Sequence, residues 1–244
     1  METVRFLPAG DRALSVELGQ TVDPAVNARV RGLDRAVKRE QLPGVVETVP
    51  SYRALLVYYE PETVSCAQLT AALAALVRGL DGQAVPPGDL VELPVCYGGD
   101  LGPDLPFVAQ HTGQTEQEVV ALHSGPDYLV YLLGFTPGFP YLGGMDPRIA
   151  APRLATPRVK IPAGSVGIAG QQTGVYPLDS PGGWQLIGRT PVRLYDPGRE
   201  QPILLAPGDR VRFRPVEKAE YETILDAVVR GTYVCTRHPG EERT

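Results

Sequence analysis

The sequence predicts two domains, an α+β domain over residues 1–82 and an all-β barrel over residues 90–230. Three observations support this division. The first 80 residues alternate between strand-like and helix-like apolar patterns. Residues 81–90 are rich in Gly and Pro, as linkers often are. Beyond them, Gly or Pro occupies 18 of the 50 positions in 134–183, a density that no long helix tolerates.

The predicted elements of the first domain follow the order strand, strand, helix, strand, strand, helix. Alternating apolar side chains mark the strands, and an apolar stripe at helical spacing begins after Asp23-Pro24, a capping pair. Ser65 is the predicted cap of the second helix. This order is typical of an antiparallel sheet with both helices on one face. The four strands are expected at 3–7, 12–18, 45–49 and 54–59.

The second domain begins with a strand at 93–97 and two short helices at 104–111 and 115–123. Thr115 and Glu118 form a predicted capping box at the second of these helices. From Tyr128 onward we expect short strands joined by tight turns, and a closed barrel pairs the edges of such strands. Residues 217–230 are expected to form a terminal helix.

Composition excludes several classes of protein. The net charge of −5 gives no basic face for nucleic acid. The three cysteines form no CxxC pair, so a disulfide framework is not expected. No apolar run reaches the roughly 18 residues of a membrane span, and the N-terminus shows no signal-peptide pattern. We therefore expect a cytoplasmic protein that binds neither nucleic acid nor membrane.

Short catalytic motifs are weak here. The chain has no GxxxxGK[ST] loop for ATP phosphates. Ala163–Gly167 resembles a nucleophile elbow, but an elbow needs a helix after the serine and a later histidine, so serine hydrolysis is not favoured. His111 and His123 lack a third ligand at metal spacing, so no metal site is expected. His123 is interpreted as complementing the C-terminus of its helix.

Longer motifs carry more information. They are YGGDLGPDL (97–105), GFTPGFPYLGGMDPR (134–148), PRVKIPAGSVGIAGQQTGVYP (157–177) and SPGGWQLIGRTP (180–191), together with VPSYRALLVYY (49–59). With these motifs the sequence resembles the carboxyltransferase-domain family that contains the B subunit of 5-oxoprolinase, the sporulation kinase inhibitor KipI and allophanate hydrolase subunit 1. The resemblance covers essentially the whole chain and implies a cyclophilin-like barrel for the second domain.

The resemblance implies a component of an ATP-dependent 5-oxoprolinase, which converts 5-oxo-L-proline to L-glutamate. Its implied partners are the KipA-like C subunit and the LamB/YcsF-like A subunit of that enzyme, and its implied cofactor is ATP, shared with the complex. Two alternatives remain open: a KipI-like inhibitor that docks on a histidine kinase, and allophanate hydrolase subunit 1. In each case, we expect the isolated chain to show no 5-oxoproline-dependent ATP hydrolysis.

Candidate site residues are the polar side chains within the Gly- and Pro-rich motifs. Cationic groups suit phosphate or carboxylate, and polar groups suit a lactam. Phe135, Phe139 and Trp184 are candidates for an apolar wall, with core packing as the alternative. Lys160 is the weakest cationic candidate. The substrate-binding candidates are Arg158, Gln172, Thr173, Tyr176 and Ser180.

Three structural expectations accompany these residues. Segments 134–148 and 157–184 should lie together at one mouth of the barrel and leave a concave surface there. Phe139-Pro140 is a candidate cis peptide bond. A component of a complex should also expose an apolar patch with aromatic or Arg anchors, unless those residues pack inward as core. The candidate interface residues are Tyr141, Leu142, Met145, Trp184 and Arg189.

Overall fold

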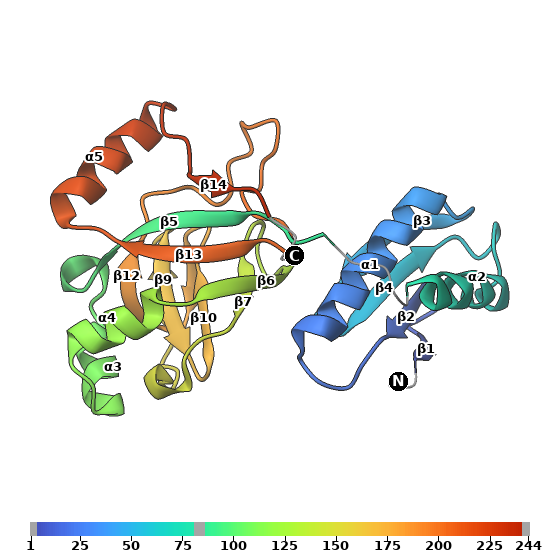
Figure 1. The fold of residues 1–244 in the computed structure, drawn as a ribbon, viewed down its shortest axis with the longest axis horizontal. Helices are drawn as coiled ribbons and strands as arrows, with labels where there is room; N and C mark the ends of the chain where they lie inside the picture. Colours follow the sequence, from blue (N-terminus) through green and yellow to red (C-terminus); the bar gives the residue numbers. More distant parts are fainter. Residues whose placement is uncertain (1–3, 81–85, 241–244) are drawn as a thin grey trace. The chain divides into compact units, whose positions relative to one another are not determined.

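The computed structural model describes residues 4–80 and 86–240, which fall into two compact units divided between Pro86 and Pro87 (Figure 1). Each unit has its own apolar core. Five residues of the predicted linker, 81–85, lie outside the described residues. None of the helices in the described ranges is long and apolar enough to cross a membrane.

The first unit is a four-stranded antiparallel sheet in the order β1-β2-β4-β3, with two helices. The core cluster joins side chains of both helices to one face of the sheet, as the amphipathic patterns predict. Asp23 caps α1 and Ser65 caps α2, each through a side-chain oxygen that accepts backbone N–H groups. The elements are β1 (Arg5–Pro8), β2 (Ala13–Glu17), α1 (Pro24–Glu40), β3 (Val45–Pro50), β4 (Ala54–Tyr59) and α2 (Cys66–Gly79).

The second unit contains a barrel-like sheet in the order β10-β9-β12-β5-β13-β6-β7, with β14 beside β5. The sheet curls until β10 lies against β7, so the barrel is nearly closed, as predicted. A Cβ on Gly174 of β10 would lie only 3.5 Å from the carbonyl oxygen of Pro140 in β7. The strands are β5 (Leu90–Tyr97), β6 (Asp127–Leu133), β7 (Pro140–Gly143), β9 (Ser165–Ala169), β10 (Gln172–Val175), β12 (Gln185–Arg189), β13 (Arg210–Pro215) and β14 (Arg237–His238).

Two further features of this unit position the candidate site. A separate two-stranded ribbon pairs β8 (Arg158–Ile161) with β11 (Ser180–Gly182). The predicted helices are present, and Thr115 and Glu118 form the predicted capping box. The helices are α3 (Leu105–Thr112), α4 (Glu116–Ser124) and α5 (Lys218–Val229), with short 3-10 turns η1 (Gly99–Leu101) and η2 (Pro147–Ile149).

One strand pairing lies beyond what the sequence predicts. β13 runs parallel to β5 along six residue pairs, although the neighbouring strand pairs are antiparallel. More than 110 residues separate these two strands in sequence, and local patterns carry no information on pairing at that distance.

The prediction of a cis bond at Phe139-Pro140 is wrong, since this peptide is trans. The chain reverses by other means. Phe135 and Gly138 adopt positive φ angles of 62° and 79°, and Pro140 then begins β7 opposite Leu133. Because these two residues make the turn, Pro140 is free to take the extended conformation of a strand end.

Candidate functional site

Segments 134–148 and 157–184 meet in a cluster of aromatic side chains that we call the aromatic cluster: Phe139, Tyr141, Tyr176 and Trp184. The predicted proximity of the two segments is confirmed, and a concave surface beside them stays a prediction. Phe139 lies at its centre, with ring centroids 5.4 Å from Tyr141, 5.7 Å from Tyr176 and 5.9 Å from Trp184, all near edge-to-face. Such contacts stabilise ring pairs beyond the area they bury. The cluster is therefore a firm wall beneath the ribbon of β8 and β11.

Phe135 differs from the buried members of this wall. Its ring meets Phe139 edge-to-face at 5.6 Å, yet Phe135 is 67% exposed. Thr136 N donates to Gly134 O, which closes a γ-turn around Phe135. Positive φ in a bulky residue costs free energy and often accompanies function. Phe139 and Trp184 therefore pack as core, the alternative to an apolar wall, and only Phe135 exposes its ring.

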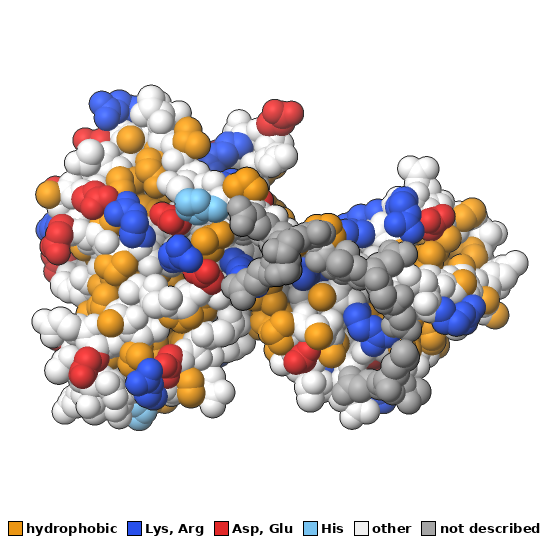
Figure 2. Space-filling view, in the orientation of Figure 1, with side chains coloured by type: hydrophobic (Ala, Val, Ile, Leu, Met, Phe, Trp, Pro, Cys, Tyr) orange, Lys and Arg blue, Asp and Glu red, His pale blue; other side chains and the backbone are white. Residues whose placement is uncertain are grey.

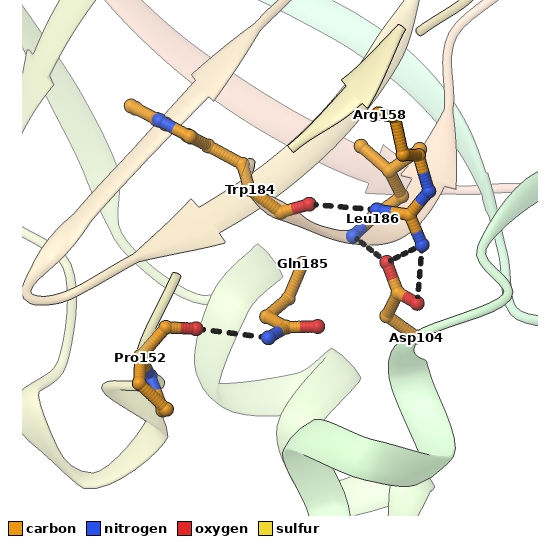
Figure 3. A network of polar contacts seen from close by, with 6 residues as sticks. All are labelled: Asp104, Pro152, Arg158, Trp184, Gln185 and Leu186. Atoms are coloured by element: carbon orange, nitrogen blue, oxygen red, sulfur yellow. Dashed lines mark hydrogen bonds and ion pairs between the residues drawn. The ribbon is translucent and has the colours of Figure 1, made fainter. Parts of the chain in front are cut away.

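Three hydrogen bonds hold the Arg158 guanidinium, as Figure 3 shows. Its Nη2 donates to both carboxylate oxygens of Asp104, at 2.7 and 2.8 Å, and its Nη1 donates to Trp184 O. The same carboxylate accepts from Leu186 N at 2.6 Å. Arg158 therefore ties the start of α3 to β12, and 29% of its side chain remains exposed.

Asp104 was not among the predicted site residues. Its position just before a helix that opens with Leu105-Pro106 suggests an ordinary N-cap, yet its side chain makes no capping hydrogen bond. It binds Arg158 instead, across 54 positions of sequence. Only the tertiary structure reveals this pairing.

Other polar groups surround Trp184. The Arg153 guanidinium lies 5.9 Å from the centroid of the Trp184 ring, in a cation–π position. Gln185 Nε2 donates to Pro152 O, which joins the loop before β8 to β12 (Figure 3). Lys160 pairs with Asp179, and this hydrogen bond lowers the pKa of the Asp179 carboxyl. The site therefore carries several cations, two of them already paired with carboxylates.

Tyr176 is 2% exposed, and burial raises the pKa of its phenol to about 12, against opposing effects of Arg153 and Arg158. The hydroxyl is therefore protonated at neutral pH. Gly182 allows the close approach of β11 here, because a Cβ at that position would lie 2.5 Å from Tyr176 Oη. The glycine of the SPGGW motif thus fits the ribbon onto the aromatic cluster.

Ser180 carries a hydroxyl whose Oγ is buried and has no hydrogen-bond partner among the described residues. Ser180 lies opposite Ile161 in the ribbon, beside the aromatic cluster. A buried hydroxyl without a partner costs free energy, and a bound polar molecule would recover it. This makes Ser180 the best-placed of the predicted polar residues.

Thr173 has a different place. It is 1% exposed and belongs to a buried hydrogen-bond chain that runs from Tyr97 through His123 and Thr173 to Gly167. Thr173 Oγ1 donates to Gly167 O at 3.0 Å, so it accepts from His123 Nε2 at 2.8 Å. His123 Nδ1 then accepts from the Tyr97 hydroxyl. The hydrogen-bond chain joins α4 to three strands of the barrel.

The interpretation of His123 as a charge at the end of its helix is wrong. Burial lowers the pKa of its imidazole to about 3, so the ring is neutral at physiological pH. The ring also stacks on Phe213 at 4.6 Å between centroids. A neutral, fully buried ring contributes through packing and hydrogen bonds, not through the helix dipole.

The remaining predicted residues lie near the same region. Gln172 begins β10 and is half-buried. Arg189 ends β12, and its positive charge adds to the Lys160 hydrogen bond in lowering the pKa of Asp179. Ser165, in the elbow-like segment, is fully buried at the start of β9 and is followed by a strand, not by the helix of an elbow.

The exposed patch expected on the interface residues is absent. Leu142, Met145 and Trp184 are 4%, 9% and 8% exposed, and Tyr141 and Arg189 are half-buried. The first two join the core of the barrel. Leu142 packs inward because β7 alternates its side chains, and Met145, just after β7, joins the same core. A docking surface for a partner is therefore expected elsewhere on the chain, for example on the first unit.

Comparison with known proteins defines the class. Residues 4–205 match the family model described as carboxyltransferase domain, subdomain C and D. Among solved structures, the K. lactis urea amidolyase superposes with a TM-score of 0.79 at 25% identity, covering 96% of this chain and 16% of that chain. The crystal structure of TTHA0988 gives a TM-score of 0.75 at 44% identity, covering 84% of this chain and 40% of that chain. The fold is that of a carboxyltransferase domain.

Curated relatives narrow the identification. The B subunit of 5-oxoprolinase from Bacillus subtilis (strain 168) is 41% identical over 90% of this chain and 96% of the relative. The B subunit of 5-oxoprolinase from Escherichia coli O157:H7 is 45% identical over 88% of this chain and 97% of the relative. The urea amidolyase of Lachancea kluyveri is 28% identical over 94% of this chain and 14% of that protein. The chain belongs to the family that includes the 5-oxoprolinase B subunits, as its motifs predict.

Proposed function

We propose that this chain is the B subunit of an ATP-dependent 5-oxoprolinase that converts 5-oxo-L-proline to L-glutamate in the cytoplasm. The observation that carries the proposal is the 41–45% identity to two proteins named as 5-oxoprolinase B subunits, over nearly the full length of each. The proposed partners are the KipA-like C subunit and the LamB/YcsF-like A subunit.

The site offers groups that suit a small lactam with a carboxylate. The exposed ring of Phe135, backed by the aromatic cluster, provides an apolar surface, and Ser180 provides a buried hydroxyl without a partner among the described residues. The partly exposed guanidinium of Arg158, held in place by Asp104, provides further N–H donors. Gln172 stands nearby on β10, whereas the buried hydroxyl of Thr173 positions strands in this scheme.

ATP fits this chain poorly by itself. Arg158 is paired with Asp104 and Lys160 with Asp179, so two cations near the site are neutralised within the chain. A triphosphate needs several unneutralised donors or a metal ion. We therefore place the nucleotide on the partner proteins, with its reacting end brought to this site. When bound, ATP would supply the phosphoryl group that, on the amide oxygen, makes the lactam carbon a better electrophile for water.

A reconstituted complex tests the proposal. The chain is co-expressed with the two partner proteins, and 5-oxoproline-dependent ATP hydrolysis and glutamate formation are measured. We expect turnover by the complex and none by this chain alone. Turnover by the chain alone would show that the active site is self-contained, and failure of the three proteins to co-purify would refute the proposed membership of a complex.

The Ser180→Ala variant tests whether the Ser180 hydroxyl binds substrate or only contributes to the stability of the fold. Removal of a buried hydroxyl without a partner should leave the melting temperature unchanged or raise it. Loss of a hydrogen bond to the substrate should lower kcat/KM of the complex about tenfold. The matched control is Ser165→Ala, which removes another buried hydroxyl without a described partner. Ser165 lies on β9, outside the ribbon of β8 and β11. Equal activity of both variants would contradict the role of Ser180.

A second candidate function is that of an allophanate hydrolase subunit 1. It is supported by the similarity to urea amidolyases, which extends over 94% of this chain. The same complex assayed with allophanate in place of 5-oxoproline distinguishes the two. Inhibition of histidine kinase autophosphorylation by the isolated chain would instead support the KipI-like role.

A further inference from the structure

A hollow lies on the barrel unit, built from segments that the family motifs do not include. It has a volume of about 400 Å³ and lies between the C-terminal end of α5, the segment 233–237 and the hairpin 192–204. In Figure 1 the helix and this hairpin rise from the same side of the unit, and Figure 2 shows the notch between them. Small-molecule sites typically occupy about 300–1,000 Å³. We call this hollow the α5 pocket.

The α5 pocket has both apolar and polar walls, with Asp196, Arg199 and Arg237 as its charged lining residues. Val192, Leu204 and Val228 line it from the hairpin and from the helix, and Tyr233 adds an aromatic ring. Burial raises the pKa of the Tyr233 phenol, which therefore stays neutral at physiological pH. The pocket can therefore cover the hydrocarbon body of a small molecule.

One wall carries an arginine with donors to spare. Arg199 Nη1 donates to Arg193 O at 3.1 Å, while its Nε lies 3.6 Å from the carboxylate of Asp196, beyond a good hydrogen bond. A guanidinium has five N–H groups and binds carboxylates in a two-pronged manner. Arg199 is 38% exposed and can therefore accept such a ligand without breaking a strong internal pair.

The backbone beneath Arg199 is well ordered by local hydrogen bonds. Asp196 accepts from Gly198 N through its side chain, and Arg199 N donates to Asp196 O. Asp196 N donates to Pro202 O, which closes the hairpin. The guanidinium is thus mounted on a rigid turn, which lowers the entropy lost on binding.

The other polar groups of the pocket are already engaged. Arg237 donates to Asp89 at 3.1 Å and to Leu204 O, so it supports the wall. The Cys235 thiol donates to Glu92 O, and burial raises its pKa to about 11, so it is not a nucleophile at neutral pH. The pocket is therefore suited to binding and not to covalent chemistry.

We propose that the α5 pocket binds a small amphipathic carboxylate, with the carboxylate on Arg199 and the apolar body against Val192, Val228 and Tyr233. This inference does not depend on the proposed 5-oxoprolinase reaction, because neither the ribbon nor the aromatic cluster contributes to the pocket. A ligand here would act as a second, regulatory or accessory molecule.

Benzoate serves as the probe, and benzamide as its uncharged counterpart of nearly the same shape. The full chain labelled with ¹⁵N is titrated with each, and amide shifts are mapped by NMR. We expect saturable benzoate shifts confined to residues 192–204 and 228–237, with benzamide at least tenfold weaker. Shifts elsewhere, no saturable shifts, or equal binding of the two probes would overturn the proposal.

Three variants complete the test. Arg199→Gln should lower the affinity for benzoate about tenfold or more, as expected for loss of a charge-assisted hydrogen bond. Val228→Phe should fill the pocket and abolish binding while every charge remains. Arg230→Gln is the matched control, an exposed arginine at the end of α5 that does not line the pocket, and it should bind as the wild type does. Wild-type affinity in either of the first two variants would refute the assigned site.

Discussion

The buried imidazole of His123 gives a quantitative prediction about acid stability. The pKa of His123 is about 3 in the folded protein, against 6.5 for an ordinary histidine. Below pH 6.5 the unfolded chain binds a proton that the folded protein excludes, so stability falls as pH falls from 6.5 towards 3. Between pH 7 and pH 5 this single group should remove roughly 2 kcal/mol of the free energy of unfolding.

His123→Gln removes the titration and keeps one donor and one acceptor for Thr173 and Tyr97. The variant should be less stable at pH 7, by about 1–3 kcal/mol, because the stack on Phe213 and good hydrogen-bond geometry are lost. Its stability should nevertheless fall less steeply with acid than that of the wild type. The expected difference in the pH 7 to pH 5 change is roughly 2 kcal/mol.

Urea unfolding followed by tryptophan fluorescence at pH 7, 6 and 5 measures this difference. The chain has one tryptophan, Trp184, in the barrel unit, so the signal reports on the unit that holds His123. His111→Gln, at an exposed histidine on α3, is the control and should follow the wild type. If the wild type and His123→Gln lose stability in parallel, the imidazole is not held neutral by burial, and the reasoning fails.

Three further outcomes are expected in the same unfolding assay. Arg158→Gln should cost roughly 1–3 kcal/mol, because it leaves the partly buried Asp104 carboxylate with fewer donors; an unchanged midpoint would show that the pair is dispensable. Phe139→Ala should cost about 3–5 kcal/mol by opening a cavity in the aromatic cluster, whereas Phe107→Ala, at an exposed ring, should cost far less. Phe135→Gly should not lower stability and can raise it by about 1 kcal/mol, because glycine relieves the positive φ; a clear loss would mean that the ring stabilises the fold.

Local sequence chemistry was a reliable guide to the elements. Asp23, Ser65 and Thr115 each cap the predicted helix, because capping depends on side chains within three residues of one another. The density of Gly and Pro in 134–183 correctly predicted short strands and turns. The sequence did not predict which turn contains a strained residue, because nothing in the residues around Phe135 indicates its positive φ.

The candidate site was predicted less completely. The motifs supplied Arg158, Tyr176 and Ser180 as candidates, and the structure places Tyr176 within the aromatic cluster and Ser180 beside it. The sequence did not show that Asp104 would neutralise Arg158. Nor did it show that Thr173 would join His123 in the core. Both contacts link residues about 50 positions apart, and their formation depends on how the barrel closes.

The sequence by itself determined the helices and most strands and, through its motifs, the family. The tertiary structure alone decided the parallel pairing of β5 with β13, the inward packing of Met145 and Trp184, and the neutral state of His123. The physical reason is one of range. Periodicity and capping act over a few residues, whereas burial, pKa and ion pairing depend on neighbours that only the folded chain brings together.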